Sequence, residues 1–181
     1  SNSIIKKNDM KKKFYLAILA AICFMALTSC GYSINQPGEM PGNVQTVYVN
    51  VFDNLTSEAG LETIIATSIV SEISRFDAKL VTATPGEADA VIRGTIRAIS
   101  SQSIAKRGVN VAAERLAVLY VDCQLVDRNG MVLWQVRNLS DSEPYLVFDD
   151  KISSEASKYN AYGIIAARLA EQIYNQMTDK F

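Results

Sequence analysis

The amino-acid sequence predicts an α+β fold: a two-layer sandwich in which two helices cover one face of a mostly antiparallel sheet of four to five strands. Three observations lead to this expectation. Apolar residues recur at helical spacing in residues 60–76 and again in residues 154–177. Between these stretches apolar and polar residues alternate, which is typical of strands with one buried face. Asn129-Gly130, a strong hairpin signal, separates two of the alternating stretches. Helices at both ends of an antiparallel meander favour two layers.

The start of the chain is typical of a secretion signal. Lys11, Lys12 and Lys13 precede an uncharged apolar run over residues 14–27. A membrane-spanning helix needs about 20 apolar residues, so this shorter run indicates a signal peptide. Leu27-Thr28-Ser29-Cys30 resembles the bacterial lipobox. That resemblance implies cleavage before Cys30 and a lipid on the cysteine, where two or more acyl chains anchor stably. The alternative is a buried N-terminal helix with an incidental cysteine.

The chain then divides into three parts. Residues 1–29 are expected to be an upstream extension followed by the signal peptide, with Met10 as the natural start. Residues 30–45, rich in proline and glycine, are expected to form the lipidated N-terminus and a tether. Residues 46–181 are expected to form a single α+β domain. Gly31, in place of aspartate, resembles the outer-membrane sorting signal of enteric bacteria.

Within the domain, the predicted element order is β-α-β-β-β-β-α. The first three elements are a strand over residues 46–52, a helix over residues 60–76 and a short strand over residues 79–82, which Pro85-Gly86 ends. The apolar stripe of the helix has six members: Leu61, Ile64, Ile65, Ile69, Ile73 and Phe76.

The second half of the domain is predicted to contain three strands and the final helix. The strands cover residues 90–99, 114–127 and 131–139, and the helix covers residues 154–177, after a polar loop that contains Pro144. The inward residues predicted for the first of these strands are Ala90, Ile92, Gly94, Ile96 and Ala98. The inward residues predicted for the second are Ala117, Leu119, Val121, Cys123 and Leu125. Val132, Trp134 and Val136 are expected on one face of the third, with Trp134 packed between the sheet and a helix.

Charge and composition exclude several functions. Losing residues 1–29 removes five lysines and one aspartate, which takes the 18 basic and 19 acidic residues of the chain to 13 and 18. Such an acidic domain is a poor candidate for nucleic acid, whose binding depends on neutralising phosphates. The chain has no histidine, so it lacks the commonest general base and a frequent zinc ligand. We therefore expect no enzyme, no catalytic residue, no metal and no cofactor.

The cysteines do not change this interpretation. Cys23 lies in the signal peptide and Cys30 is the predicted lipid site, which leaves Cys123 without an intramolecular partner. A nucleophilic role for Cys123 is conceivable, but no histidine can activate it, and it lies on the inward face of a strand. A buried structural thiol is the better interpretation. Asp149-Asp150 could contact calcium, but a single acidic pair in a loop is a weak signal, and solvated surface residues are the better interpretation.

Several motifs resemble one family, the lipopolysaccharide-assembly lipoproteins (the LptE family). They occur in order along nearly the whole mature chain, although each by itself recurs in other envelope lipoproteins. The motifs are Cys30-Gly31-Tyr32, Val47–Asn54, Glu58–Glu62, Ala88–Ile96, Leu125–Gly130, Leu133-Trp134, Asn138–Ser140 and Glu143–Tyr145. An alanine-rich terminal helix completes the resemblance.

This resemblance implies a non-enzymatic outer-membrane lipoprotein. Family members plug the lumen of the large β-barrel that translocates lipopolysaccharide, assist assembly of that barrel, and contact lipopolysaccharide. The expected partners are therefore the barrel and the glycolipid, with a lipid anchor on Cys30 in the outer membrane. The domain would face the periplasm or the barrel lumen.

Lipopolysaccharide carries phosphates, which favour arginine and lysine as ligands. The candidate contacts are Arg93 and Arg97 on the outward strand face, Lys106 and Arg107 in the following loop, and Arg115 after it. For each of them an ordinary solvated cation is the favoured alternative interpretation. The alternative function is an interaction module of another envelope machine, such as a cell-wall synthase activator or a secretion-pore assembly lipoprotein.

Overall fold

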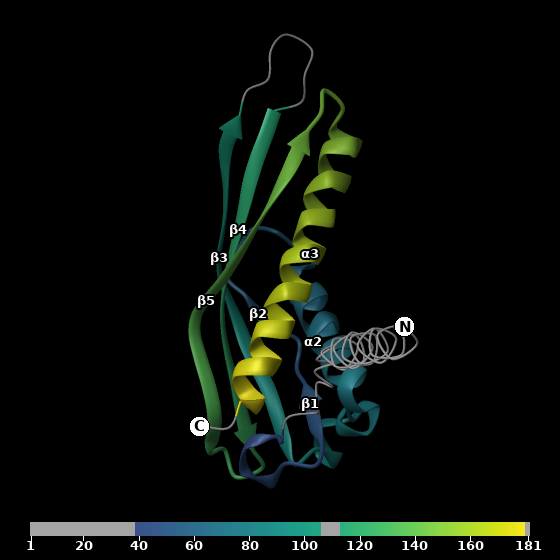
Figure 1. Ribbon diagram of the computed structural model, residues 1–181, viewed down its shortest axis with the longest axis vertical. Helices are drawn as coiled ribbons and strands as arrows, with labels where there is room; N and C mark the ends of the chain where they lie inside the picture. Colours follow the sequence, from purple (N-terminus) through teal and green to yellow (C-terminus); the bar gives the residue numbers. More distant parts are fainter. Residues whose placement is uncertain (1–38, 106–112, 180–181) are drawn as a thin grey trace, which may run out of the picture. The chain divides into compact units, whose positions relative to one another are not determined.

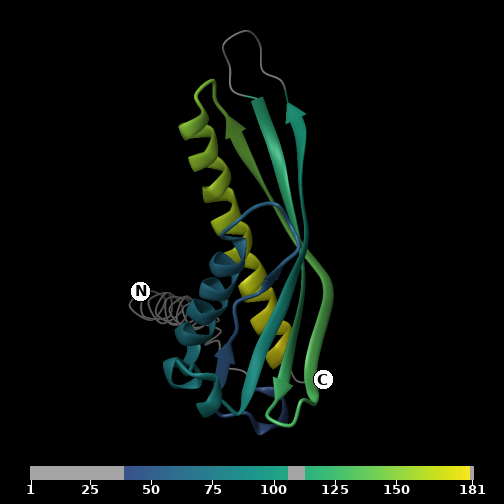
Figure 2. The ribbon, with the colours of Figure 1, turned by 180° about the vertical axis from the view of Figure 1, so that it is seen from behind.

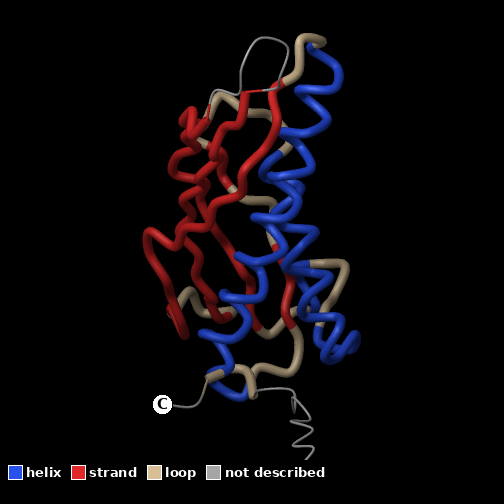
Figure 3. The backbone as a smooth tube through the Cα atoms, turned by 45° about the horizontal axis from the view of Figure 1, so that its top comes forward, coloured by secondary structure: helices blue, strands red, loops and turns tan. Residues whose placement is uncertain are grey.

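The domain has the predicted two layers. The computed structural model describes residues 39–105 and 113–179, which belong to one compact unit. Figures 1 and 2 show the sheet on one side and helices α2 (Leu61–Asp77) and α3 (Lys151–Thr178) on the other. Seen with its top tilted forward, the unit has both helices against the same sheet face (Figure 3). The predicted α+β class, with two helices on one face, is therefore confirmed.

The sheet is mixed. Its strands are β1 (Val47–Val49), β2 (Asp53–Asn54), β3 (Ala90–Ala105), β4 (Ala113–Asp127) and β5 (Val132–Val147). The order is β1-β3-β4-β5, and β2 also pairs with β3. Strands β3, β4 and β5 are antiparallel, whereas β1 and β2 run parallel to β3. The parallel part arises because α2 lies between β2 and β3 and carries the chain back to the same end of the sheet.

The first predicted strand is interrupted. Only Val47–Val49 of it form a strand, β1, and β2 follows at Asp53–Asn54, beyond the predicted end at residue 52. The buried Phe52 lies just before β2. The Phe52 ring occupies the space above Gly94 of β3: a Cβ atom at residue 94 would lie 1.9 Å from the ring. Absence of a side chain at Gly94 thus lets an aromatic ring pack directly on the sheet backbone.

The strand predicted over residues 79–82 is wrong. Ala78–Leu80 form a 3₁₀ helix, and only Val81 makes an isolated parallel bridge, to Val47. The Asp77 carboxylate accepts a hydrogen bond of 2.9 Å from the Lys79 backbone N–H, which stabilises the turn instead of an extended segment.

Both long strands extend beyond their predicted ends. β3 continues to Ala105, and β5 continues to Val147 through Pro144, which the sequence had placed in a loop. Pro144 pairs with Leu116 of β4. Proline is tolerated here because β5 is an edge strand, where a missing N–H need not break a hydrogen-bond ladder.

The inward face of β3 was predicted correctly as far as Ile96 and wrongly for Ala98. Ala98 is exposed, and the next residue, Ile99, packs against the core. The pairing between β3 and β4 shifts between Ile96 and Ala98. This β-bulge adds one residue to β3 and therefore exchanges the two faces beyond it.

The helix boundaries have local causes. Gly60 precedes α2 with a φ of 89°, and its N–H donates to the Glu62 carboxylate at 3.2 Å. Helix α3 begins three residues earlier than predicted because the Asp150 carboxylate accepts a 2.7 Å hydrogen bond from the Ser153 N–H. Asp150 is therefore a helix cap.

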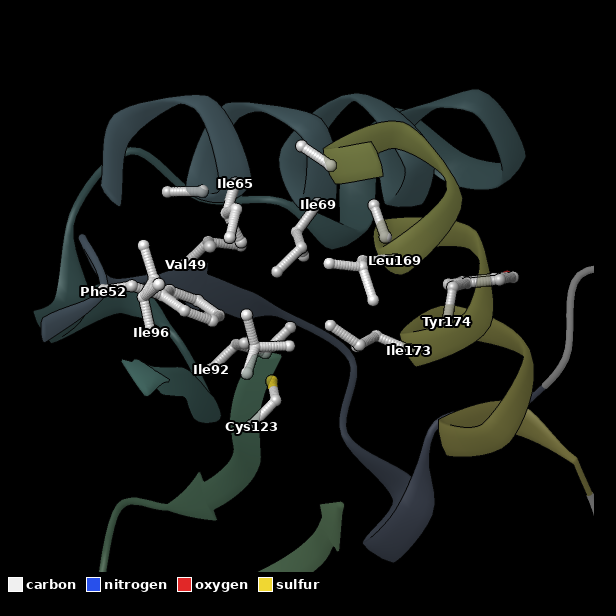
Figure 4. Packing of buried hydrophobic residues seen from close by; sticks show 14 of the residues in the cluster. Val49, Phe52, Ile65, Ile69, Ile92, Ile96, Cys123, Leu169, Ile173 and Tyr174 are labelled. Carbon is white, nitrogen blue, oxygen red and sulfur yellow. The ribbon is translucent and has the colours of Figure 1, made fainter. Parts of the chain in front are cut away.

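The core lies between the helices and the inner sheet face. Figure 4 shows Ile65 and Ile69 of α2 and Leu169 and Ile173 of α3 directed toward Cys123 and its neighbours. Cys123 is 2% exposed and free, and burial raises the pKa of its thiol to about 12. It is thus a buried thiol, as predicted.

Trp134 lies on the predicted face of its strand but is less buried than predicted. It faces the helix side of the sheet, opposite the buried Leu125, as predicted. Val132, which was predicted to share this face, does not: the pairing shifts between Leu125 and Val126, and Val132 lies opposite Val126 and is 47% exposed. Trp134 is only partly buried, however, at the margin of the core beside Met177 and Met40.

Candidate functional site: an arginine-lined groove on the open sheet face

One face of the sheet carries no helix (Figure 3). This face contains a groove of about 580 Å³. It crosses the middle of β3, β4 and β5, and β2 contributes one residue to its wall. The charged lining residues are Asp53, Arg93, Arg97, Asp122 and Arg137. Here "the arginine groove" means this site. Its residues alternate along the strands with core residues, so the strand pleat directs them away from the helices.

Two irregularities of the sheet flank Asp122, near the centre of the arginine groove. On one side, Arg97 is the extra residue at the bulge of β3. On the other side, Arg137 and Asn138 of β5 together lie opposite Asp122, and Asn138 adopts a φ of 53°. Bulges redirect side chains and increase local twist. The two bulges therefore bring arginines from both neighbouring strands to the same part of the open face.

The charges of the arginine groove are only partly paired. Arg97 Nε lies 3.6 Å from Asp122 Oδ2, while Asp122 Oδ1 accepts a 2.8 Å hydrogen bond from the Asn138 N–H. Within residues 39–105 and 113–179, Arg93 and Arg137 make no ion pair and no side-chain hydrogen bond. Three guanidinium groups thus face two carboxylates, Asp53 and Asp122. The groove carries a local positive excess in a domain that is acidic overall.

This set of groups suits an anionic ligand rich in hydroxyls. A guanidinium can donate two parallel hydrogen bonds to a phosphate or carboxylate. Gln124 and Gln135 lie opposite each other and next to Arg93 in the strand register, and they also line the groove. Their amides can both donate and accept hydrogen bonds, as sugar hydroxyls require.

The five candidate cations do not form one site. Arg93 and Arg97 meet in the arginine groove. Arg115 lies opposite the buried Tyr145, on the helix side of the sheet, and donates a 3.3 Å hydrogen bond to the Ser101 carbonyl. Lys106 and Arg107 lie outside the described residues, as does Cys30.

Sequence reasoning missed Arg137, although a signal was present. Val136 was assigned to the inward face of its strand, so alternation alone would have directed Arg137 outward. What could not be read from the sequence was that bulges would place Arg137 and Arg97 on either side of Asp122.

A second, smaller cavity of about 280 Å³ lies beside the C-terminal end of α3. Trp134, Met40 and Met177 contribute its apolar wall. Trp134 is adjacent in β5 to Gln135 of the arginine groove, but it faces the helix side of the sheet.

The fold and the arginine groove define a small two-layer α+β domain with a cationic open sheet face. Among known families, the model described as "Lipopolysaccharide-assembly" matches residues 44–177. The chain belongs to this lipopolysaccharide-assembly family, a family of non-enzymatic assembly lipoproteins. No curated protein matches the chain significantly.

Solved structures of several bacterial lipoproteins are similar to this chain. Lipoprotein B from Nitrosomonas europaea is 16% identical, with coverage of 82% of this chain and 90% of that chain and a TM-score of 0.47. Rare lipoprotein B from Shewanella oneidensis is 13% identical, with coverage of 72% and 92% and a TM-score of 0.46. A minor lipoprotein from Acinetobacter baumannii is 17% identical, with coverage of 75% and 92% and a TM-score of 0.43.

The helices of the described part of the chain, α2 and α3 included, are each too short or too polar to cross a bilayer.

Proposed function

We propose that this chain is a lipid-anchored outer-membrane lipoprotein that assists assembly of the large β-barrel translocon of lipopolysaccharide. In this proposal the domain occupies the barrel lumen, and the arginine groove contacts phosphate groups of lipopolysaccharide. Membership of the lipopolysaccharide-assembly family supports a role in lipopolysaccharide assembly. The lipid anchor is Cys30, for which the lipobox-like residues 27–30 provide the support.

One observation carries the glycolipid contact: Arg93, Arg97 and Arg137 converge on the helix-free face. A guanidinium is weakly hydrated and presents paired N–H donors, so it favours an anionic partner that can accept two hydrogen bonds. Phosphates on a sugar backbone are such partners, and they lie next to hydroxyls. The open face is also polar along this part of the sheet, which agrees with the polar interior of a wide barrel.

The contact is tested by neutralising two arginines. In Arg93→Gln/Arg97→Gln, binding of lipopolysaccharide should weaken about tenfold or more, because each charge-assisted hydrogen bond contributes about 1.5–3 kcal/mol. Glutamine removes the charge without creating new repulsion beside Asp122. Arg137→Gln alone should weaken binding less. The measurement is a titration of purified, folded protein with lipopolysaccharide.

Arg75→Gln is the matched control, because the Arg75 side chain is 60% exposed, like the 57% exposed Arg97, but lies on α2 in the other layer. The double variant should still co-purify with the barrel, since a broad interface tolerates two polar changes. Unchanged titration would remove Arg93 and Arg97 from the site. Failure of the wild-type chain to capture any large barrel would defeat the plug proposal and favour another envelope machine.

The lipid anchor has its own test. Cys30→Ala should abolish acylation and leave the signal peptide uncleaved, because the thiol that receives the lipid is gone. The measurement is incorporation of labelled palmitate together with the mass of the chain. Cys123→Ala is the control, since this buried thiol should not be acylated. Labelled palmitate on the Cys30→Ala protein would refute the lipobox interpretation.

A further inference from the structure

Beyond the arginine groove, the open sheet face changes character. Toward the end of the sheet where β5 leads into α3, the next three positions of β4 on this face are Tyr120, Val118 and Leu116, each half-buried. They follow Asp122 directly in the alternation of the strand. Four residues of strand span about 14 Å, so a narrow apolar surface continues from the groove for that distance.

The neighbouring strands keep this surface free of charge. The β3 residues that pair with the three apolar residues are Ala98, Ser100 and Gln102, and the β5 residues are Ser140, Ser142 and Pro144. All nine residues are uncharged, and together they form what is called here the uncharged strip. At its far end Leu146 adds a further apolar side chain, 44% exposed, on β5. In contrast, the adjacent arginine groove contains five charged residues.

The β3 bulge creates this continuity. In a regular ladder without the bulge, Arg97 rather than Ala98 would lie opposite Tyr120, and Ile99 rather than Ser100 would lie opposite Val118. The bulge thus places small residues beside the apolar side chains of β4. The result is a charged region and an apolar region in line along a single strand.

We propose that the uncharged strip takes an acyl chain of the same phosphate-bearing glycolipid whose headgroup binds in the arginine groove. This rests on the proposed function and adds the orientation of the ligand. The phosphate contacts the guanidinium groups of Arg93, Arg97 and Arg137, and the acyl chain extends along β4 toward Leu116. An apolar surface that continues from an anion site fits an amphiphile, whose apolar and anionic parts are covalently joined.

The experiment compares two soluble probes on the full chain, solubilised at one fixed concentration of mild detergent. One probe is a short-chain acylated glucosamine phosphate, and the other is the same sugar phosphate without its acyl chain. In Leu116→Gln/Val118→Thr, affinity for the acylated probe should fall about tenfold, because apolar contact area is lost. Affinity for the deacylated probe should stay within about twofold of wild type.

Two further variants keep the test decisive. Met131→Gln/Ile164→Thr makes the same kinds of change at exposed apolar residues outside the strip and should leave both affinities unchanged. Ser140→Asp, at an exposed position on the strip, places a charge there without altering the apolar side chains of β4. It should lower the affinity for the acylated probe. This variant therefore tests the strip even if the double variant folds poorly.

The acyl-chain assignment would be overturned if folded strip variants lost affinity equally for both probes, or lost affinity for neither. The assignment would also be overturned if the strip variants bound both probes as wild type does but no longer co-purified with the barrel, because the strip would then contact protein. These failures differ from failure of the proposed function, in which Arg93→Gln/Arg97→Gln would leave the deacylated probe bound as in wild type.

Discussion

Individual charged residues join segments of this domain that are far apart in sequence. Lys158 of α3 is paired with Glu58 at 3.1 Å and Glu155 at 2.8 Å, and its side chain is only 16% exposed. Burial acts to lower the pKa of Lys158, but the hydrogen bonds that its ammonium donates to the Glu155 and Glu58 carboxylates outweigh this effect and raise the pKa. The ion pair between Lys158 and Glu58 connects the loop before α2 to the final helix. At the end of β2, Asn54 donates 2.8 Å hydrogen bonds to the Glu58 carbonyl and the Glu62 carboxylate.

Asp89 has a similar role beside β1 and gives a prediction about pH. Its carboxylate accepts hydrogen bonds from the Thr46 hydroxyl at 3.0 Å, the Gln45 N–H at 3.1 Å and the Thr46 N–H at 3.0 Å. These bonds, the Thr46 hydroxyl first, lower the pKa of Asp89, with a further contribution from Arg128. Because the folded-state pKa is lowered, the stabilisation is present above the ordinary aspartate value of about 4 and is lost as pH falls through the folded-state pKa.

We therefore expect Asp89→Asn to be less stable than wild type at pH 7 and to approach wild type near pH 3. The measurement is urea unfolding at the two pH values. Asp149→Asn, at an exposed loop position, is the control and should not show this convergence. A stability difference that is the same at both pH values would contradict the role assigned to Asp89.

At the scale of elements, the edge strand β5 and helix α3 are held together by more than apolar packing. Arg168 of α3 contacts Asp141 at 3.0 Å, Glu143 at 2.8 Å and the Ser142 carbonyl at 2.7 Å. Hydrogen bonds to Asp141 and Glu143 raise the pKa of Arg168, which remains charged. These contacts fix the helix over the part of β5 that lies beyond its bulge, so the open face opposite keeps its shape.

Gly94 provides a prediction about how β2 is attached to β3. In Gly94→Ala the new methyl group would overlap the Phe52 ring, whose nearest atom lies 1.9 Å from the Cβ position. Overpacking of this kind costs about 1–3 kcal/mol of unfolding free energy. Chemical denaturation measures this loss. In Gly94→Ala/Phe52→Leu the smaller side chain should restore part of the stability; if it restores none, the ring is not the cause.

For the whole molecule, the proposed barrel complex should be unusually stable. A lumen wall would encircle the domain, so the buried area should exceed the roughly 1,600 Å² of a standard interface. We expect the complex to remain intact in detergent and at elevated ionic strength, where a contact held by a few surface charges would dissociate. Electrophoresis of the complex without prior heating measures this. Dissociation at moderate salt would indicate a peripheral contact instead.

The sequence by itself determined the local features of this protein. The apolar stripe of residues 61–76 predicted α2, and the alternation of residues 114–127 predicted β4 with its buried face, because periodicity depends only on the geometry of one element. Asn129-Gly130 predicted the turn between β4 and β5, since Gly130 takes up its φ of 86° without strain. The lipid site at Cys30 and the contacts with lipopolysaccharide remain predictions.

Only the tertiary structure decided the features that depend on pairing between strands. The parallel pairing of β1 with β3, the inclusion of Pro144 in an edge strand and the two bulges beside Asp122 each depend on which strands are neighbours. A bulge changes which face a residue occupies without leaving a distinct local pattern, because both strands must be known to see that one carries an extra residue. For this reason the sequence identified Arg93 and Arg97 as outward cations, whereas their meeting with Arg137 in one groove emerged from the folded sheet.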